Sequence, residues 1–270
     1  MTTLIKSATI VDPSSPFNLQ QKDLLIIDGI IDQIQDHIEE KSNYTIVVLK
    51  NLHISSGWFD TSVSFGEPGY EERETIENGL LVAAKSGFTK VAVNANNNPI
   101  TDNKSGVSFL VNTSKGAAAS LYPIGAITQQ SKGKEMAELY DMQQAGAIAF
   151  GDYNTSVAHD NLMKIALLYT QNFDGLLINY PNNVEISGEG NANEGINSTK
   201  LGLKGIPALA EHLQIARDLF LLEYTGGKLH IPTISSATSV ALIAEAKNKG
   251  LKTKPIEKKE KAHFHCESEF

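Results

Sequence analysis

Residues 57–69 read GWFDTSVSFGEPG, and the pattern that decides the fold starts with this stretch. The run 58–65 is rich in aromatic and β-branched residues, which predicts a strand, and Glu67-Pro68-Gly69 is a turn signal. In a strand, residues i and i+2 point the same way, so Ser62 and Ser64 are predicted to share a face near the strand's end. A His-x-His pair at such a place can hold one cation with two imidazoles. A serine hydroxyl is neutral at pH 7 and is a poor ligand for zinc.

Downstream of this stretch, strand patterns alternate with helix patterns. Candidate strands lie at 58–65, 89–94, 121–127, 147–151, 175–179 and 228–234. Candidate helices lie at 71–86, 104–115, 134–144, 159–170, 207–224 and 238–249. Ser235 or Ser236 can cap the last helix, and Gly250 fits the left-handed position after its end. Six βα units in series predict an α/β fold with a parallel sheet, either open or closed as a (β/α) barrel.

The two ends of the chain have different patterns. Residues 1–53 read as short strands, with Asp28 and Gly29 as a hairpin turn, and predict a small N-terminal β-subdomain. Residues 54–251 hold barrel units one to six. Residues 252–270 are charged and contain a proline, so we expect a solvated tail rather than a seventh buried strand. The barrel is therefore expected to be C-terminally incomplete.

Composition excludes several classes of protein. The formal net charge is −8, which argues against a nucleic-acid partner or an anionic membrane surface. No run of about 18 apolar residues predicts a membrane span, and the first residues lack the apolar region of a signal peptide. Cys266 is the single cysteine, which rules out an internal disulfide framework. We therefore expect a cytoplasmic protein.

The predicted strand ends, where a barrel carries its catalytic groups, are polar but almost uncharged. Asp152 is the one good metal ligand among them, and a catalytic zinc usually needs three protein ligands. Asp152 can equally hydrogen-bond backbone amides at a βα turn, and Asn96 can equally be a loop former. Ser62 and Ser64 lack a histidine or lysine in these motifs that could activate them as nucleophiles.

The histidines add little evidence for a catalytic or metal-binding site. His53, His159, His212 and His230 are scattered, and structural or solvent roles are the simpler interpretation. The cluster His263-x-His265-Cys266 has ligand chemistry but lies in the polar tail without a fourth partner nearby.

Seven motifs in series resemble the dihydroorotase family of the amidohydrolase superfamily over residues 1–251. They are 57–69, Asn96-x-x-Pro99, 146–152 (GAIAFGD), 193–195 (NEG), 201–207 (LGLKGIP), 216–218 (ARD) and 225–231 (TGGKLHI). The resemblance implies a TIM-type amidohydrolase barrel. Active members of this family use zinc to open the dihydroorotate ring reversibly.

The family's site residues can be carried over position by position. The two first-strand histidines fall on Ser62 and Ser64, and the arginine that holds the substrate carboxylate falls on Gly66. Asn96 matches a substrate-contacting asparagine, and Asp152 matches a metal-bridging aspartate.

The later strands depart further from the family's pattern. The fifth-strand histidine falls on Asn179 or on Tyr180, depending on a one-residue alignment choice, and the sixth-strand histidine falls on Thr233. The strand that carries the family's catalytic aspartate has no counterpart in these residues. Every imidazole ligand is therefore replaced.

Three hypotheses follow. The leading one is a catalytically silent dihydroorotase homologue, a pseudoenzyme without a cofactor that acts as a binding or scaffold partner in pyrimidine biosynthesis. By family analogy its partner would be aspartate carbamoyltransferase, and a homo-oligomer is expected. The second is an active zinc-dependent dihydroorotase. The third is a truncated product without function, whose edge strands would be left uncovered.

Overall fold

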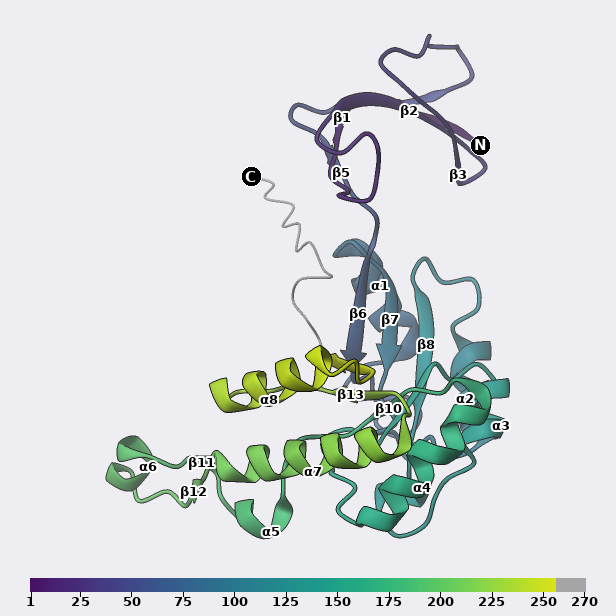
Figure 1. Ribbon diagram of the computed structural model, residues 1–270. Helices are drawn as coiled ribbons and strands as arrows, with labels where there is room; N and C mark the ends of the chain where they lie inside the picture. Colours follow the sequence, from purple (N-terminus) through teal and green to yellow (C-terminus); the bar gives the residue numbers. More distant parts are fainter. Residues whose placement is uncertain (256–270) are drawn as a thin grey trace. The chain divides into compact units, whose positions relative to one another are not determined.

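The computed structural model describes residues 1–255 of the 270, and its internal contacts divide them into two units. The first unit comprises Met1–Gly57, and the second begins at Trp58 (Figure 1). Each unit has apolar clusters of its own. The division therefore falls four residues beyond the boundary at residue 53 that the sequence predicts.

The first unit is a five-stranded sheet built around its first strand. Its strands are β1 (Thr2–Ile10), β2 (Gln21–Ile27), β3 (Ile30–Gln35), β4 (Thr45–Val47) and β5 (His53–Ile54). β1 pairs antiparallel with β2 and parallel with β4 and β5, while β3 pairs with β2. Asp28 and Gly29 join β2 to β3 at φ values of 49° and 82°, which confirms the predicted hairpin. Leu4, Leu25 and Ile38 form one of its two small cores.

The second unit contains a parallel sheet whose strands neighbour one another in chain order. They are β6 (Trp58–Val63), β7 (Phe88–Val93), β8 (Ser120–Gly125), β9 (Ala149–Gly151), β10 (Leu177–Ile178), β13 (Leu229–Ile231) and β14 (Thr253–Pro255). This sequential order is that of a (β/α) barrel, whereas a doubly wound sheet reverses its order midway. The sheet curls, so that β10 and β13 run steeply across the direction of β6–β8 (Figure 1). The predicted barrel class is thus confirmed as a partial barrel.

All six predicted helices are present. They are α1 (Ile76–Lys85), α2 (Lys104–Thr113), α3 (Leu139–Gln144), α4 (Asp160–Thr170), α7 (Leu209–Thr225) and α8 (Ala237–Asn248). Ser236 caps α8 by accepting a hydrogen bond from the Ser239 amide, and Gly250 lies at φ 81°, both as predicted. α1 starts five residues later than expected because Gly66 and Glu74 close a turn through a backbone hydrogen bond before Thr75 caps the helix.

An excursion between β10 and α7 is absent from the predictions. It consists of α5 (Val184–Ser187), β11 (Ala192–Asn193), α6 (Ile196–Lys200) and β12 (Gly205–Ile206). β11 and β12 pair only with each other, as a two-residue parallel ladder. Two 3-10 turns, η1 (Gln129–Ser131) and η2 (Gln171–Phe173), complete the elements.

The sequence predicts no strand in residues 252–270, and this prediction is wrong for Thr253–Pro255, which form β14. β14 pairs parallel with β13, with Thr253 opposite Leu229 and Pro255 opposite Ile231. An edge strand needs backbone hydrogen bonds on one side only, which is why it tolerates a proline that a central strand would not. The remainder of the predicted tail, including the cluster His263-x-His265-Cys266, lies outside the described residues.

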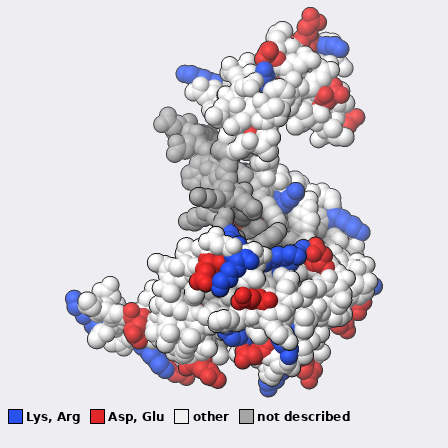
Figure 2. Space-filling view, in the orientation of Figure 1, with Lys and Arg blue, Asp and Glu red and all other residues white. Residues whose placement is uncertain are grey.

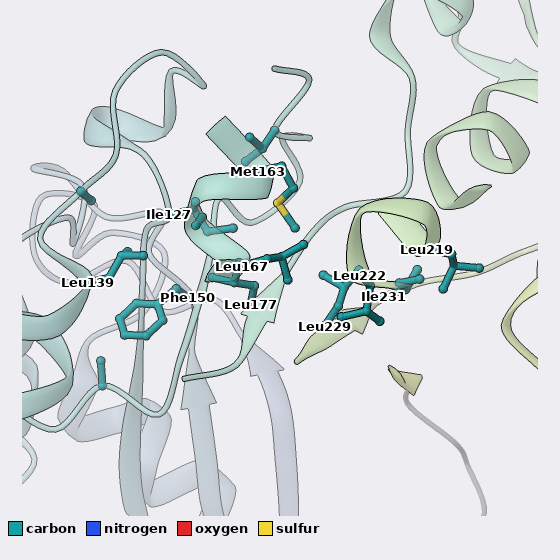
Figure 3. Packing of buried hydrophobic residues seen from close by; sticks show 14 of the residues in the cluster. Ile127, Leu139, Phe150, Met163, Leu167, Leu177, Leu219, Leu222, Leu229 and Ile231 are labelled. Atoms are coloured by element: carbon teal, nitrogen blue, oxygen red, sulfur yellow. The ribbon is translucent and has the colours of Figure 1, made fainter. Parts of the chain in front are cut away.

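The largest core lies between the outer face of the sheet and the helices that cover it. Phe150, Leu177 and Leu229 project from β9, β10 and β13 into this cluster (Figure 3). Leu167 of α4 and Leu222 of α7 meet them from the helix layer. The opposite, inner face carries a smaller cluster: Ala92, Ile124, Ala149, Phe59, Leu176 and Ile178.

The surface offers no broad area of one charge on the face drawn in Figure 2. Over the described residues of that face, blue Lys and Arg side chains are interspersed with red Asp and Glu side chains. No helix in residues 1–255 is both long enough and apolar enough to span a bilayer.

Candidate functional site

A cavity of about 270 Å³ opens at the carboxyl ends of the strands of the second unit. Among the described residues that line it, three carry aromatic rings, namely Tyr153, Tyr180 and His230. Its other polar lining residues are Thr61, Ser62, Asn94, Asn154 and Thr233. The described lining also includes Ile124, Gly151, Ile178 and Pro232. The cavity therefore lies where (β/α) barrels carry their functional groups.

Strand alternation explains how the floor of the cavity is formed. Gly151, Ile178 and His230 are paired side by side on β9, β10 and β13. Their chain neighbours point to the outer core, so these three face inward. A β-carbon at position 151 would lie 3.0 Å from the Ile178 side chain, so glycine keeps this part of the floor open. Sequence reasoning assigned His230 a structural or solvent role, and the alternation of Leu229, His230 and Ile231 is the signal that would have placed it in the cavity.

The first-strand serines are each paired with an asparagine that follows the next strand. The Asn94 amide nitrogen donates to Ser62 Oγ at 3.0 Å and to the Val63 carbonyl at 3.1 Å. The Asn96 amide nitrogen donates to Ser64 Oγ. Ser62 and Asn94 line the cavity, whereas Ser64 and Asn96 are not among its lining residues. Asn94 is thus a candidate binding residue that sequence reasoning missed. It lies two residues before Asn96 in the chain.

Asp152 is 3 % exposed and turns away from the cavity. Its Oδ1 accepts hydrogen bonds from the backbone amides of Ile127 at 2.8 Å and Thr128 at 3.1 Å, and its Oδ2 accepts from the Thr128 hydroxyl. Burial raises the pKa of this carboxyl, although these hydrogen bonds favour the ionised form. The carboxylate therefore joins β9 to the loop that follows β8.

The structure separates the two residues that could match the fifth-strand histidine. Tyr180 lines the cavity. Asn179 is buried on the other side, where its amide nitrogen donates to Asp218 Oδ2 at 2.7 Å and its oxygen accepts from the Val157 amide at 2.9 Å. Tyr180 is therefore the residue that occupies the inward position after β10.

Asp218 is the most perturbed carboxyl among the described groups. It is 1 % exposed on α7, and burial raises its pKa to about 6. The Arg217 guanidinium, 2.7 Å from Asp218 Oδ1, and the Asn179 amide act in the opposite direction by stabilising the charge. Because Asp218 does not line the cavity, its role is to hold α7 against the turn after β10.

Two residues that line the cavity have left-handed backbone conformations. Tyr153 has φ 56°, and Thr233 has φ 57°. Bulky and β-branched residues rarely adopt this region, and such strain concentrates at binding sites. Thr233 follows β13 and Tyr153 follows β9, so the strained positions come from two different strand ends.

Position 66, which the resemblance matches to a carboxylate-binding arginine, has no room for a side chain. A β-carbon on Gly66 would lie 1.7 Å from the Tyr70 carbonyl oxygen. The backbone is held there because the Gly66 amide donates to Glu74 and its carbonyl accepts from Tyr70. An arginine at this position would require a different turn.

The cavity residues do not fit a catalytic zinc. Within residues 1–255, no three His, Cys, Asp or Glu side chains are grouped so that they could hold a metal ion. His230 supplies one imidazole, while Ser62, Tyr180 and Thr233 supply neutral hydroxyls. Zinc sites usually combine three or four imidazole, thiolate or carboxylate ligands.

The family profile and the curated relatives that match this chain agree with one another. The dihydro-orotase-like family profile matches residues 53–239. The dihydroorotase of Pelotomaculum thermopropionicum is 42% identical over 93% of this chain and 58% of its own length. That of Acetivibrio thermocellus is 40% identical over 92% of this chain and 58% of its own. The chain therefore spans somewhat more than half the length of these curated relatives.

Solved structures support the fold. The L-hydantoinase (dihydropyrimidinase) of Arthrobacter aurescens superposes with a TM-score of 0.73 at 16% identity, covering 94% of this chain and 57% of that one. The dihydropyrimidinase of Brevibacillus agri gives 0.69 at 16% identity, with the same coverage of both chains. The family profile, the curated relatives and the partial barrel agree, and the chain belongs to the dihydroorotase-like family.

Proposed function

We propose that this chain is a dihydroorotase-like protein of pyrimidine biosynthesis that works by binding rather than by zinc-dependent hydrolysis. The observation that carries the proposal is the chemistry of the inward positions at the strand ends. Ser62, Tyr180 and Thr233 project hydroxyls where the resemblance expects imidazoles. Zinc-dependent hydrolysis needs a metal that lowers the pKa of its bound water, and three hydroxyls are poor ligands for such a metal.

The remaining titratable groups do not supply a substitute mechanism. Asp152 uses both carboxylate oxygens in hydrogen bonds to Ile127 and Thr128, so it is not placed to take a proton from a water in the cavity. His230 supplies a single imidazole to the cavity, and the other described residues that line it are neutral. These groups support binding better than turnover.

The test is metal analysis of the purified protein together with a dihydroorotate ring-opening assay. We expect zinc well below one per chain after equilibration with zinc and removal of excess, and no turnover above the uncatalysed rate. A matched variant that carries Ser62→His, Tyr180→His and Thr233→His should retain more zinc than the natural chain. Near-stoichiometric zinc with measurable turnover in the natural chain would overturn the proposal.

An active zinc-dependent dihydroorotase is the second candidate. The observation in its favour is the 42% identity over 93% of the chain with a curated protein named dihydroorotase. Turnover in the ring-opening assay that is lost on chelation and restored by zinc would establish it.

The proposed partner is aspartate carbamoyltransferase, by family analogy, with the chain itself forming a homo-oligomer. Co-purification of the two proteins from the native cell, followed by sizing of the complex, tests both statements. Absence of aspartate carbamoyltransferase from the purified material would remove the partner, and a monomer by light scattering would remove the homo-oligomer.

A further inference from the structure

We propose that two copies of this chain associate through the outward face of α7, with their two α7 helices packed antiparallel. The inference deepens the proposed function, on which it rests, because it names the surface and the partner of the proposed homo-oligomer. It follows from an apolar ridge on α7, from the position of a small residue at the centre of that ridge, and from the charges at the two ends of the helix.

Four apolar side chains form a continuous ridge on the side of α7 that faces away from the sheet. They are Leu209, Leu213, Phe220 and Tyr224, called here the α7 ridge. At 3.6 residues per turn these four side chains point within about 60° of one another, over a length of about 22 Å. The buried residues of α7, such as Ile215, lie on the opposite side of the helix. Figure 1 shows α7 in the outer layer of the second unit, where it packs beside α4 and α8.

The ridge presents enough apolar surface for the centre of an interface. Phe220 and Tyr224 are 71 % and 78 % exposed and are the two most exposed aromatic side chains in the described part of the chain. Together they present on the order of 300 Å² of surface. Leu209 and Leu213 are half-exposed, and so is Ile165 on the neighbouring helix α4. Contiguous apolar patches larger than a few hundred Å² mark interaction sites, and a stable dimer buries about 800 Å² on each partner, with an apolar centre and a polar rim.

The order of residues along the ridge fits a second copy of the same helix. A two-fold contact requires a surface that is complementary to itself. The midpoint between Leu209 and Tyr224 falls at Ala216, whose small side chain points to the same side of α7. Two antiparallel α7 helices can therefore approach closely at Ala216. Leu209 and Leu213 of one copy then lie beside Tyr224 and Phe220 of the other, so each aliphatic side chain meets an aromatic ring.

The charges at the ends of α7 favour the antiparallel arrangement. Glu223 is exposed beside the ridge near the carboxyl end of the helix, and no side chain caps the amino end at Ala208. The amino end of a helix carries the positive end of its dipole, which attracts a carboxylate. In an antiparallel pair, Glu223 of each copy lies near the amino end of the other α7. A parallel pair would instead bring the two Glu223 carboxylates together.

Light scattering across a range of concentrations of the full chain tests the ridge. We expect the natural chain to show the mass of two chains, and Phe220→Glu combined with Tyr224→Glu should weaken the association at least about a hundredfold. Ile30→Glu is the matched control, because Ile30 is 73 % exposed but belongs to the first unit, and it should leave the association unchanged. A natural chain that stays monomeric, a ridge variant that remains a dimer, or an equal effect of Ile30→Glu would overturn the inference.

A disulfide cross-link tests the antiparallel register. Cys266 is the only cysteine, so Cys266→Ser provides a cysteine-free background. In that background Ala216→Cys should give a disulfide-linked dimer on oxidation, because the two-fold axis beside residue 216 brings the two Cα atoms within the roughly 7 Å that a disulfide allows. Ala244→Cys, on the exposed face of α8, is the control and should stay unlinked. Absence of the link at position 216, or equal linking at both positions, would overturn the inference. Zinc content and turnover decide the proposed function separately.

Discussion

The outer and inner faces of β9, β10 and β13 are built from alternating residues of the same strands and have different chemistry. Outward, Phe150, Leu177 and Leu229 are fully buried against the helices. Inward, the residues next to them in the chain are Gly151, Ile178 and His230, which line a cavity. Adjacent residues of the same strand therefore have different roles. One side chain packs in the core that stabilises the fold, and the next faces the cavity that can bind a ligand.

This contrast separates the residues that stabilise the fold from the residues at the strand ends that line the cavity. The outer face contributes the free energy of burial, which depends on the size and shape of apolar side chains. The inner face at the strand ends contributes little to that burial, so residues such as Ser62, Tyr180 and Thr233 can be exchanged there without loss of the barrel. Stability and ligand binding can thus be perturbed independently, and the experiments below test that separation.

The largest expected effect comes from the outer face. Phe150→Ala removes a side chain that is 1 % exposed and contacts Phe173 edge-on, so it should lower the free energy of unfolding by about 3–5 kcal/mol. Ile178→Ala on the inner face should cost only about 1–2 kcal/mol because that side chain is half-buried beside the cavity. Urea denaturation measures both. Equal losses would contradict the proposed division between the faces.

The second effect concerns the buried carboxyl behind the site. Because burial raises the pKa of Asp218 from 3.8 to about 6, the folded state binds a proton more tightly than the unfolded state. Stability attributable to this group must therefore rise as the pH falls from about 6 to about 4, by an amount on the order of 2 kcal/mol.

Asp218→Asn provides the reference for this measurement, since it keeps the shape of the side chain without its titration. The natural chain and the variant, unfolded in urea across this pH range, should differ by a pH-dependent term that favours the natural chain at acid pH. Asp152, whose pKa is also raised, titrates in both proteins and cancels in the difference. A difference that does not change with pH would show that Asp218 titrates alike in both states.

Much of the fold was predictable because local signals and global architecture agree. The order of strands and helices follows from apolar periodicity, and the ends of α8 follow from the cap at Ser236 and the glycine at 250. β14 was missed because an edge strand is specified by backbone pairing, and only Thr253 among its described side chains is buried. The short elements between β10 and α7 lack the periodicity that identifies longer ones.

The site was less predictable because it depends on register between strands that are distant in sequence. His230 faces inward only by reference to Ile178 and Gly151, with which it pairs. Tyr180 rather than Asn179 faces the cavity because the Asn179 side chain is held by Asp218, a buried partner 39 residues away in the sequence. No spacing rule within one strand carries that information.

A smaller effect on the free energy of unfolding is expected at Thr233, whose backbone has a strained left-handed conformation. Thr233→Gly removes the cost of a β-branched residue at φ 57° and should stabilise the protein by about 1 kcal/mol, the net of strain relief and the added freedom of the unfolded chain. Thr238→Gly, in the first turn of α8, should instead destabilise it by about 1 kcal/mol. If Thr233→Gly destabilises the protein as well, position 233 is not strained.

The smallest expected effect on stability is at Ser62. Its side chain is exposed and accepts one hydrogen bond from Asn94, so Ser62→Ala should change the free energy of unfolding by no more than about 0.5 kcal/mol. Thermal unfolding of the natural chain and the variant under the same conditions measures this difference as a shift in Tm. A large loss of stability in the variant would show that Ser62, like the outer-face residues, helps to hold the sheet together.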